Sequence, residues 1–201
     1  MDLDGVCADF VSSIVRTFNR RHAKLHGAIG TDWHEYRIEK LFQKPVSDLI
    51  YSIMQEPGFF AAIEPYEDAD QALRELGEVA DIEICSSPPL MEIGGVKTLN
   101  AYAAADKIGW LFRQFHDQAL AADVTLTLKK VRHEANVLID DDAIGNVVPW
   151  CLAHPHGLGY VVARPWNTDL ASRGVEIPPN MRRGAFAEAP KTIREWWAAL
   201  G

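Results

Sequence analysis

The stretch Asp2-Leu3-Asp4-Gly5-Val6 places two carboxylates one residue apart, immediately before a glycine. We interpret it as the end of a strand that runs into a turn, which glycine permits and which lets both side chains face one crevice. A helical pattern follows from about residue 8 to 25, where apolar residues recur near the helical spacing. An Asp-Gly pair after a strand is also a common turn, so this stretch alone leaves the function open.

Short apolar runs alternate with helical patterns over most of the remaining chain. This alternation predicts an α/β fold with a doubly wound, Rossmann-like parallel sheet. We expect further strands at 82–85, 124–128, 136–139 and 159–163, and helices at 68–77, 96–115, 143–154 and 190–200.

The segment 12–66 breaks the alternation and is rich in aromatic residues, with short helical patterns at 34–43 and 46–55. We expect it to form a small helical cap domain inserted after the first strand. The α/β core domain would then comprise residues 1–11 and 67–201.

Composition and charge limit the classes of partner. Hydrophobic residues make up 48% and charged residues 24% of the 201 residues, as in ordinary globular proteins. A formal net charge of −8 argues against a nucleic-acid polymer, because such binding requires Lys and Arg. Without a long apolar stretch or a signal peptide, we expect a cytoplasmic protein that does not bind membranes. We interpret Cys7, Cys85 and Cys151 as small core residues, since they form no metal-binding or redox motif.

Four polar features follow predicted strands, at the edge where open α/β sheets form their sites. Buried carboxylates in a row require pairing or a metal, and hard oxygen ligands suit Mg²⁺. Alternatively, the acidic run could cap a helix, the serines could form an ordinary loop and the lysines could face solvent. Their order and strand context favour a phosphate site. The four features are Asp2 with Asp4, Ser86-Ser87-Pro88, Lys129 or Lys130, and Asp140-Asp141.

With these four motifs the sequence resembles the haloacid dehalogenase superfamily, and more narrowly its 5′(3′)-deoxyribonucleotidases. Residues 2–10 (DLDGVCADF) match the D-x-D-G-V-x-A-D-F opening of these nucleotidases, and 84–88 (ICSSP) are similar to I-C-T-S-P. Residues 126–130 (LTLKK) match L-T-x-x-K, which selects Lys130 over Lys129. The aromatic segment 59–65 (FFAAIEP) and the acidic pair in 138–141 (LIDD) also fit.

The resemblance implies a role for each residue. Asp2 would attack phosphorus and form an aspartyl-phosphate, and Asp4 would act as general acid and then as general base. Ser86 and Lys130 would stabilise the transferring phosphoryl group. Mg²⁺ would be held by Asp2, the backbone carbonyl of Asp4, and Asp141. Asp140 would support the metal site or orient Lys130.

The substrate would be a phosphate ester, with a nucleoside monophosphate as the leading candidate. Phe10, Trp33 and Phe60 would contact the base, or else form the core of the cap, and Ser87 would contact the phosphate. Alternative functions are a phosphatase of sugar or other small phosphates and a non-catalytic binding protein. A homodimer is left open.

The sequence departs from the family at its first strand, because Met1 alone precedes Asp2 here. We expect either that the natural chain begins upstream or that the central strand is unusually short.

Overall fold

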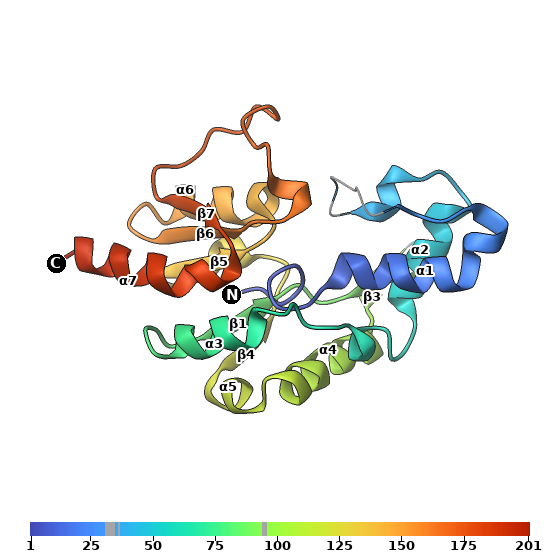
Figure 1. The fold of residues 1–201 in the computed structure, drawn as a ribbon, viewed down its shortest axis with the longest axis horizontal. Coiled ribbons are helices and arrows are strands. Elements are labelled where there is room, and N and C mark those ends of the chain that lie inside the picture. The colour runs from blue at the N-terminus through green and yellow to red at the C-terminus, as the bar shows by residue number, and fades with distance from the viewer. Residues whose placement is uncertain (31–34, 36, 94–95) are drawn as a thin grey trace.

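Two groups of parallel strands lie on either side of the N-terminal residues (Figure 1). The computed structural model describes residues 1–30, 35, 37–93 and 96–201. On one side, β1 (Glu83–Ser86) pairs with β4 (Asp123–Leu126). On the other side, β5 (Val137–Asp140) pairs with β6 (Leu158–Val162), which also pairs with β7 (Met181–Gly184).

Met1 and Asp2 join the two groups and occupy the place of a central strand. The Met1 amine donates a hydrogen bond to the Glu83 carbonyl at 2.5 Å, and the Cys85 amide donates to the Met1 carbonyl at 2.7 Å. The Asp2 amide donates to the Ile139 carbonyl at 2.9 Å. The resulting order of strands, β4-β1-N-terminus-β5-β6-β7, is the 3-2-1-4-5-6 order of doubly wound sheets. The predicted fold class is therefore confirmed.

The sheet is buried on both faces, since alternate residues of its strands enter different clusters of core residues. Ile139 and Tyr160 lie in a cluster with Leu73 of α3 (Ala69–Gly77) and Ile193 of α7 (Ala189–Ala199). Their neighbours Leu138 and Val161 instead pack with Val147, Trp150 and Cys151, which lie in and before α6 (Val148–Ala153). Successive side chains of a strand point to opposite faces, so helices cover both sides of the sheet.

Two further helices lie together at one end of the molecule, away from the sheet: α1 (Phe10–His26) and α2 (Val46–Gln55) (Figure 1). Phe10, Ile14 and Phe18 of α1 are buried at four-residue spacing, as the sequence pattern predicts. None of the helices within the described ranges is long and apolar enough to span a bilayer. The remaining elements are α4 (Ala101–Gln114), α5 (His116–Ala121), η1 (Ile38–Leu41), η2 (Phe60–Ala62), η3 (Lys130–Arg132), η4 (Ala143–Val147), η5 (Pro165–Asn167) and η6 (Phe186–Glu188).

The structure corrects the helix predicted at 96–115. Its first residues form β3 (Val96–Leu99), which pairs antiparallel with β2 (Leu90–Ile93) in a hairpin. Helix α4 begins only at Ala101, where the Asn100 side chain accepts a hydrogen bond from the Ala103 amide at 3.1 Å. This cap satisfies a backbone donor of the first turn and fixes the start of the helix there. The helix predicted at 34–43 is reduced to η1 in its described part.

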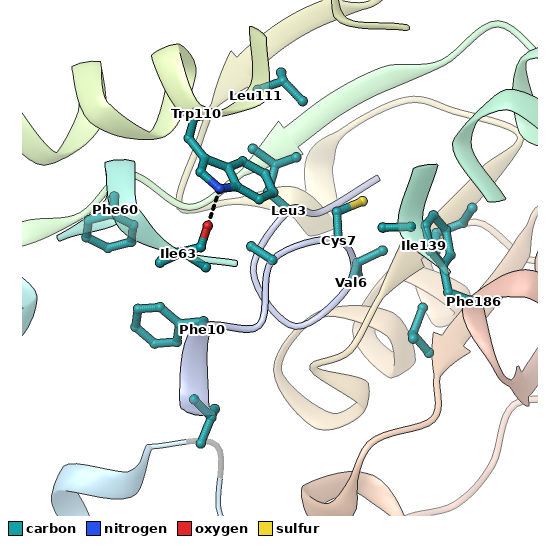
Figure 2. Close-up of a cluster of buried hydrophobic side chains, with 14 of the residues drawn as sticks. Leu3, Val6, Cys7, Phe10, Phe60, Ile63, Trp110, Leu111, Ile139 and Phe186 are labelled. Atoms are coloured by element: carbon teal, nitrogen blue, oxygen red, sulfur yellow. Dashed lines mark hydrogen bonds between the residues drawn. The ribbon is translucent and has the colours of Figure 1, made fainter. Parts of the chain in front are cut away.

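A buried cluster ties the N-terminal loop to α1 and α4 (Figure 2). The Trp110 indole of α4 donates a hydrogen bond to the Ile63 carbonyl at 2.6 Å, and both residues are buried. Leu3 and Phe60 belong to the same cluster. Because a buried polar group without a partner is costly, this bond fixes how α4 sits against the segment that leads into the sheet.

Candidate active site

Asp2 lies at the point where the strand order reverses, and both of its carboxylate oxygens are held. Its Oδ1 accepts hydrogen bonds from the Leu3 amide at 2.8 Å and from the Ser86 hydroxyl at 2.5 Å. Its Oδ2 lies 2.5 Å from the Lys130 ammonium. Burial alone would raise the pKa of Asp2, but the charges of Lys130 and Lys107 lower it below the usual value. Asp2 is therefore an ionised, oriented carboxylate.

Asp4 lies two residues further on and faces a different lysine. Its Oδ2 is 2.6 Å from the Lys107 ammonium, and both side chains are nearly inaccessible to solvent. Burial raises the pKa of Asp4, and the nearby charge of Asp2 adds to this rise, while Lys107 opposes it. The two carboxyl groups of the Asp-x-Asp motif thus have pKa values shifted in opposite directions. Such a pair is suited to two different roles in one reaction.

Lys130 connects the nucleophile candidate to the acidic pair. Its ammonium lies 2.8 Å from Asp140 Oδ2 and 2.5 Å from Asp2 Oδ2. Burial would lower the pKa of Lys130, but the charges of the two aspartates outweigh burial and raise it. The structure therefore brings together Lys130 of η3, Asp140 of β5 and Asp2, as the motif order predicts.

Asp140 and Asp141 are both buried at the end of β5. Asp140 accepts hydrogen bonds from the Asp142 amide at 2.8 Å and from the Asn146 side chain at 3.2 Å. Its pKa is raised to about 6, because burial outweighs the effect of Lys130. Burial and the charges of Asp140 and Asp2 raise the pKa of Asp141 well above its usual value. The alternative role of a helix cap falls to Asp142, which accepts from the Gly145 amide at 2.8 Å.

The acidic groups fit a divalent cation. One oxygen each of Asp2, Asp140 and Asp141 lies within 4.8 Å of the other two, and all three residues are buried. Burial raises the pKa of three of the four buried carboxyl groups of the site, those of Asp4, Asp140 and Asp141, so their charged forms are costly without a cation. A hard divalent ion such as Mg²⁺ matches the oxygen donors of Asp2, Asp140 and Asp141 and would stabilise their charged forms.

The turn after Asp4 is fixed by glycine at its tip and by Arg164, which follows β6. Gly5 adopts a φ of +71°, and a Cβ atom there would lie 2.2 Å from Asp141 Oδ2, so glycine is required. The Arg164 guanidinium donates hydrogen bonds to the carbonyls of Gly5 at 2.6 Å and Val6 at 3.0 Å. It also stacks 3.6 Å over the Tyr66 ring. These contacts hold the loop that carries the two aspartates.

The four residues predicted as substrate contacts have different surroundings. Phe10 and Phe60 stack on each other with centroids 5.7 Å apart and are almost fully buried. Ser87 is partly buried beside the site, and its carbonyl accepts a hydrogen bond from Lys107. Trp33 lies outside the described residues. Contact of these residues with a substrate remains a prediction.

Three site residues were not predicted from the sequence. Lys107 lies on the buried face of α4, where a lysine between Ala103 and Trp110 was the available signal. Trp166 donates a hydrogen bond to Asp141 Oδ2 at 2.8 Å, and Asn167 donates to the Asp141 carbonyl at 2.8 Å. Both lie in η5, which follows β6, so they complete the site from a neighbouring strand end.

A cavity of about 290 Å³ adjoins Asp141 and is also lined by Arg37, Lys40 and Arg173. Basic side chains thus reach the acidic site from two distant parts of the chain. A larger hollow of about 490 Å³ lies at the other end of the strands, around Met1, Glu83 and Val137. Sites in doubly wound sheets form at the carboxyl ends of the strands, the end at which the smaller cavity meets Asp141. Asp2, Asp4 and Lys130 do not line this cavity.

Fold and site together define a haloacid dehalogenase-like hydrolase. The fold is shared by a solved structure described as a haloacid dehalogenase-like hydrolase from Burkholderia xenovorans, with a TM-score of 0.54 and 15% sequence identity. The superposition covers 98% of this chain and 95% of that one.

The chain belongs to the family described as "5' nucleotidase, deoxy (Pyrimidine), cytosolic type C protein", whose model matches residues 1–168. It is therefore a phosphoric monoester hydrolase, and the predicted superfamily and family are confirmed. The human cytosolic-type 5'(3')-deoxyribonucleotidase is 30% identical over 149 residues, covering 70% of this chain and 68% of that protein. A Bordetella bronchiseptica protein named provisionally as a 5'(3')-deoxyribonucleotidase is 28% identical over 174 residues, covering 86% and 87%.

Proposed function

We propose that this chain is a Mg²⁺-dependent phosphatase of nucleoside monophosphates that acts through an aspartyl-phosphate on Asp2. The observation that carries the proposal is the environment of Asp2, a buried carboxylate held by Leu3, Ser86 and Lys130 two residues before Asp4. A held, ionised carboxylate at the switch point of the sheet is a nucleophile placed where phosphate esters bind in such folds.

In the first step Asp2 attacks phosphorus and the ester bond to the leaving oxygen breaks. Asp4 donates a proton to that oxygen, a role that the burial-raised pKa of its carboxyl group favours. In the second step Asp4 removes a proton from the water that attacks the phosphoryl group. Inorganic phosphate leaves and Asp2 is regenerated.

Lys130 stabilises the negative charge of the transferring group. An ammonium has three protons, and Asp2 and Asp140 accept two of those of Lys130. The third can reach a phosphoryl oxygen, and Ser87 offers a further polar contact beside it. Electrostatic stabilisation of this kind is the largest contribution that a protein makes to phosphoryl transfer.

We propose that Asp2 and Asp141 hold Mg²⁺ with the backbone carbonyl of Asp4, while Asp140 orients Lys130. When bound, the ion would neutralise charge on the phosphoryl oxygens during transfer. The three buried aspartates with oxygens within 4.8 Å of one another, Asp2, Asp140 and Asp141, support a divalent ion at this place.

The family and its named deoxyribonucleotidase members support a nucleotide as the substrate. We propose that the helical segment 12–66 forms a cap over the site, with Phe10, Phe60 and Trp33 beside the base. Phe60 lies near Asp4, because the Lys107 ammonium contacts both residues. It is 5.5 Å from the centroid of the Phe60 ring and 2.6 Å from Asp4 Oδ2. A sugar phosphate is the competing substrate. The cytoplasmic location and the homodimer stay predictions.

The mechanism is tested by trapping the intermediate. With p-nitrophenyl phosphate, whose leaving group needs no acid, the variant Asp4→Asn should accumulate enzyme carrying one phosphoryl group, detected by intact mass after acid quenching. The variant Asp2→Asn should neither carry the group nor release phosphate, although it folds. Full phosphate release by Asp2→Asn would exclude Asp2 as the nucleophile. Lack of any release by the unmodified protein would leave the rival, a non-catalytic binding protein.

A further inference from the structure

Lys107 is a second buried lysine of the site, and the proposed mechanism gives it no role. It lies in the middle of α4 with 3% of its surface exposed, on the same helix face as Ala103 and Trp110. A lysine at such a position is costly unless its ammonium is fully paired. Its presence therefore requires a set of acceptors, and the structure supplies one.

The three protons of the Lys107 ammonium have three acceptors. Asp4 Oδ2 lies at 2.6 Å, the Ser87 carbonyl oxygen at 2.9 Å and Ser86 Oγ at 3.0 Å. An ammonium offers three donors, so Lys107 has none left for a phosphate oxygen. Lys130 differs in this respect, since its two carboxylate partners leave one proton available.

We propose that Lys107 is a positioning residue that holds the Asp4 carboxyl in place and links it, through Ser86, to the nucleophile Asp2. The inference rests on the proposed function, because it assigns Asp4 the role of acid and base. The contact that the structure records for the Asp4 side chain is the one with Lys107. Without it, the Asp4 carboxyl could rotate away from the leaving oxygen, and small misplacements of reacting groups are costly in rate.

The link to Asp2 follows from the direction of the hydrogen bonds. Ser86 Oγ accepts from Lys107 and donates its single proton to Asp2 Oδ1 at 2.5 Å. A hydroxyl has one proton, so a cation on its acceptor side directs that proton to the carboxylate. Lys107 thereby orients both carboxyl groups of the Asp-x-Asp motif through one ammonium.

Helix α4 is itself fixed, so that Lys107 has a defined place. Trp110, three residues further along α4, bonds to the Ile63 carbonyl, as Figure 2 shows. The Phe60 ring also covers the Lys107 ammonium at 5.5 Å. Both contacts come from the segment just before Pro65, which a bridge joins to the N-terminal loop at Ala8.

Two substrates with different leaving groups separate this role from phosphate binding. A nucleotide such as dUMP releases an alkoxide that needs a proton from Asp4, whereas p-nitrophenyl phosphate does not. We expect Lys107→Met to lower kcat on dUMP by about 100-fold with little change in KM. The first-turnover release of p-nitrophenolate, which precedes the step that needs Asp4 as a base, should fall by at least about tenfold less than that. The control is Lys191→Met, since Lys191 is exposed on α7 and lies 3.8 Å from Glu195. It should leave both activities unchanged.

A double-mutant cycle identifies Asp4 as the group through which Lys107 acts. In an Asp4→Asn background, Lys107→Met should lower kcat on dUMP by no more than about threefold, because the positioned acid is already absent. Inhibition by inorganic phosphate should be the same in Lys107→Met and in the unmodified protein. If Lys107→Met fails to fold, Lys107→Gln, which keeps a donor without the charge, should show the same substrate dependence.

Equal losses in kcat on dUMP and in first-turnover release of p-nitrophenolate, additive effects with Asp4→Asn, or weaker inhibition by phosphate would overturn the assignment. These outcomes differ from a failure of the proposed function. In that case the unmodified protein would hydrolyse neither ester, or Asp2→Asn would stay active.

Discussion

Gly5→Ala should damage the acidic site through one added methyl group. Gly5 has a φ of +71°, a conformation that costs other residues about 1–2 kcal/mol. The added Cβ would also lie 2.2 Å from Asp141 Oδ2 and 2.3 Å from its Cγ. Asp141 cannot move freely, because it is 1% exposed and bonded to Trp166 at 2.8 Å. Overpacking of this kind adds about 1–3 kcal/mol.

Gly174→Ala is the matched control. Gly174 has a φ of +70°, but no atom lies within 4 Å of a Cβ added there. It should therefore lose only the backbone contribution, about 1–2 kcal/mol of the free energy of unfolding. Gly5→Ala should lose about 2–5 kcal/mol, because the clash with Asp141 adds to the same backbone strain.

Urea denaturation without metal measures the stability of both variants, with equal slopes indicating an unchanged unfolded state. The Mg²⁺ concentration for half-maximal phosphate release should rise at least about tenfold in Gly5→Ala and stay unchanged in Gly174→Ala. Equal denaturation midpoints and equal Mg²⁺ requirements in the two variants would refute the placement of Asp141 against Gly5.

Three further substitutions test other parts of the structure. Lys130→Met should lower the free energy of unfolding in urea by about 3–5 kcal/mol and abolish activity, because Asp2 and Asp140 lose their buried counter-ion. Lys129 is exposed, so Lys129→Met should change the free energy of unfolding by no more than about 0.5 kcal/mol. A smaller loss in Lys130→Met than in its neighbour would contradict the pairing. Trp110→Phe should cost about 1–3 kcal/mol in the same assay, since the Ile63 carbonyl loses its donor. No difference from Trp197→Phe at its exposed site would show that this bond contributes nothing. Phe60→Leu should raise KM for dUMP more than KM for a sugar phosphate, and equal changes would remove Phe60 from the base site.

The positions of the chemical groups were largely predictable, since each acidic or basic motif follows an apolar strand. The strands at 83–86, 137–140 and 158–162 lie within a residue or so of their predicted places. Their carboxyl ends meet at one edge because parallel strands run in the same direction. This explains why Asp2, Ser86, Lys130 and Asp140 come together although up to 138 positions separate them.

Contacts that depend on packing were not predictable from the sequence. Arg164 reaches the carbonyl of Gly5 across 159 positions, and no local pattern encodes such a pair. Strand β7 contains Arg182 and Arg183 rather than an apolar run, so it gave no strand signal. The sequence predicts a helix where β3 forms and predicts no strand at β2, because four-residue strands are too short to show their period. The boundaries of the proposed cap remain a prediction.

The central claim is tested most directly by phosphate release from a panel of esters, with Mg²⁺ and with the metal removed by a chelator. The account predicts release only with Mg²⁺, and faster turnover of dUMP or dTMP than of sugar phosphates. Release that continues without the metal would contradict the proposed role of Asp2 and Asp141 as ligands. A flat profile across the esters would contradict the nucleotide assignment.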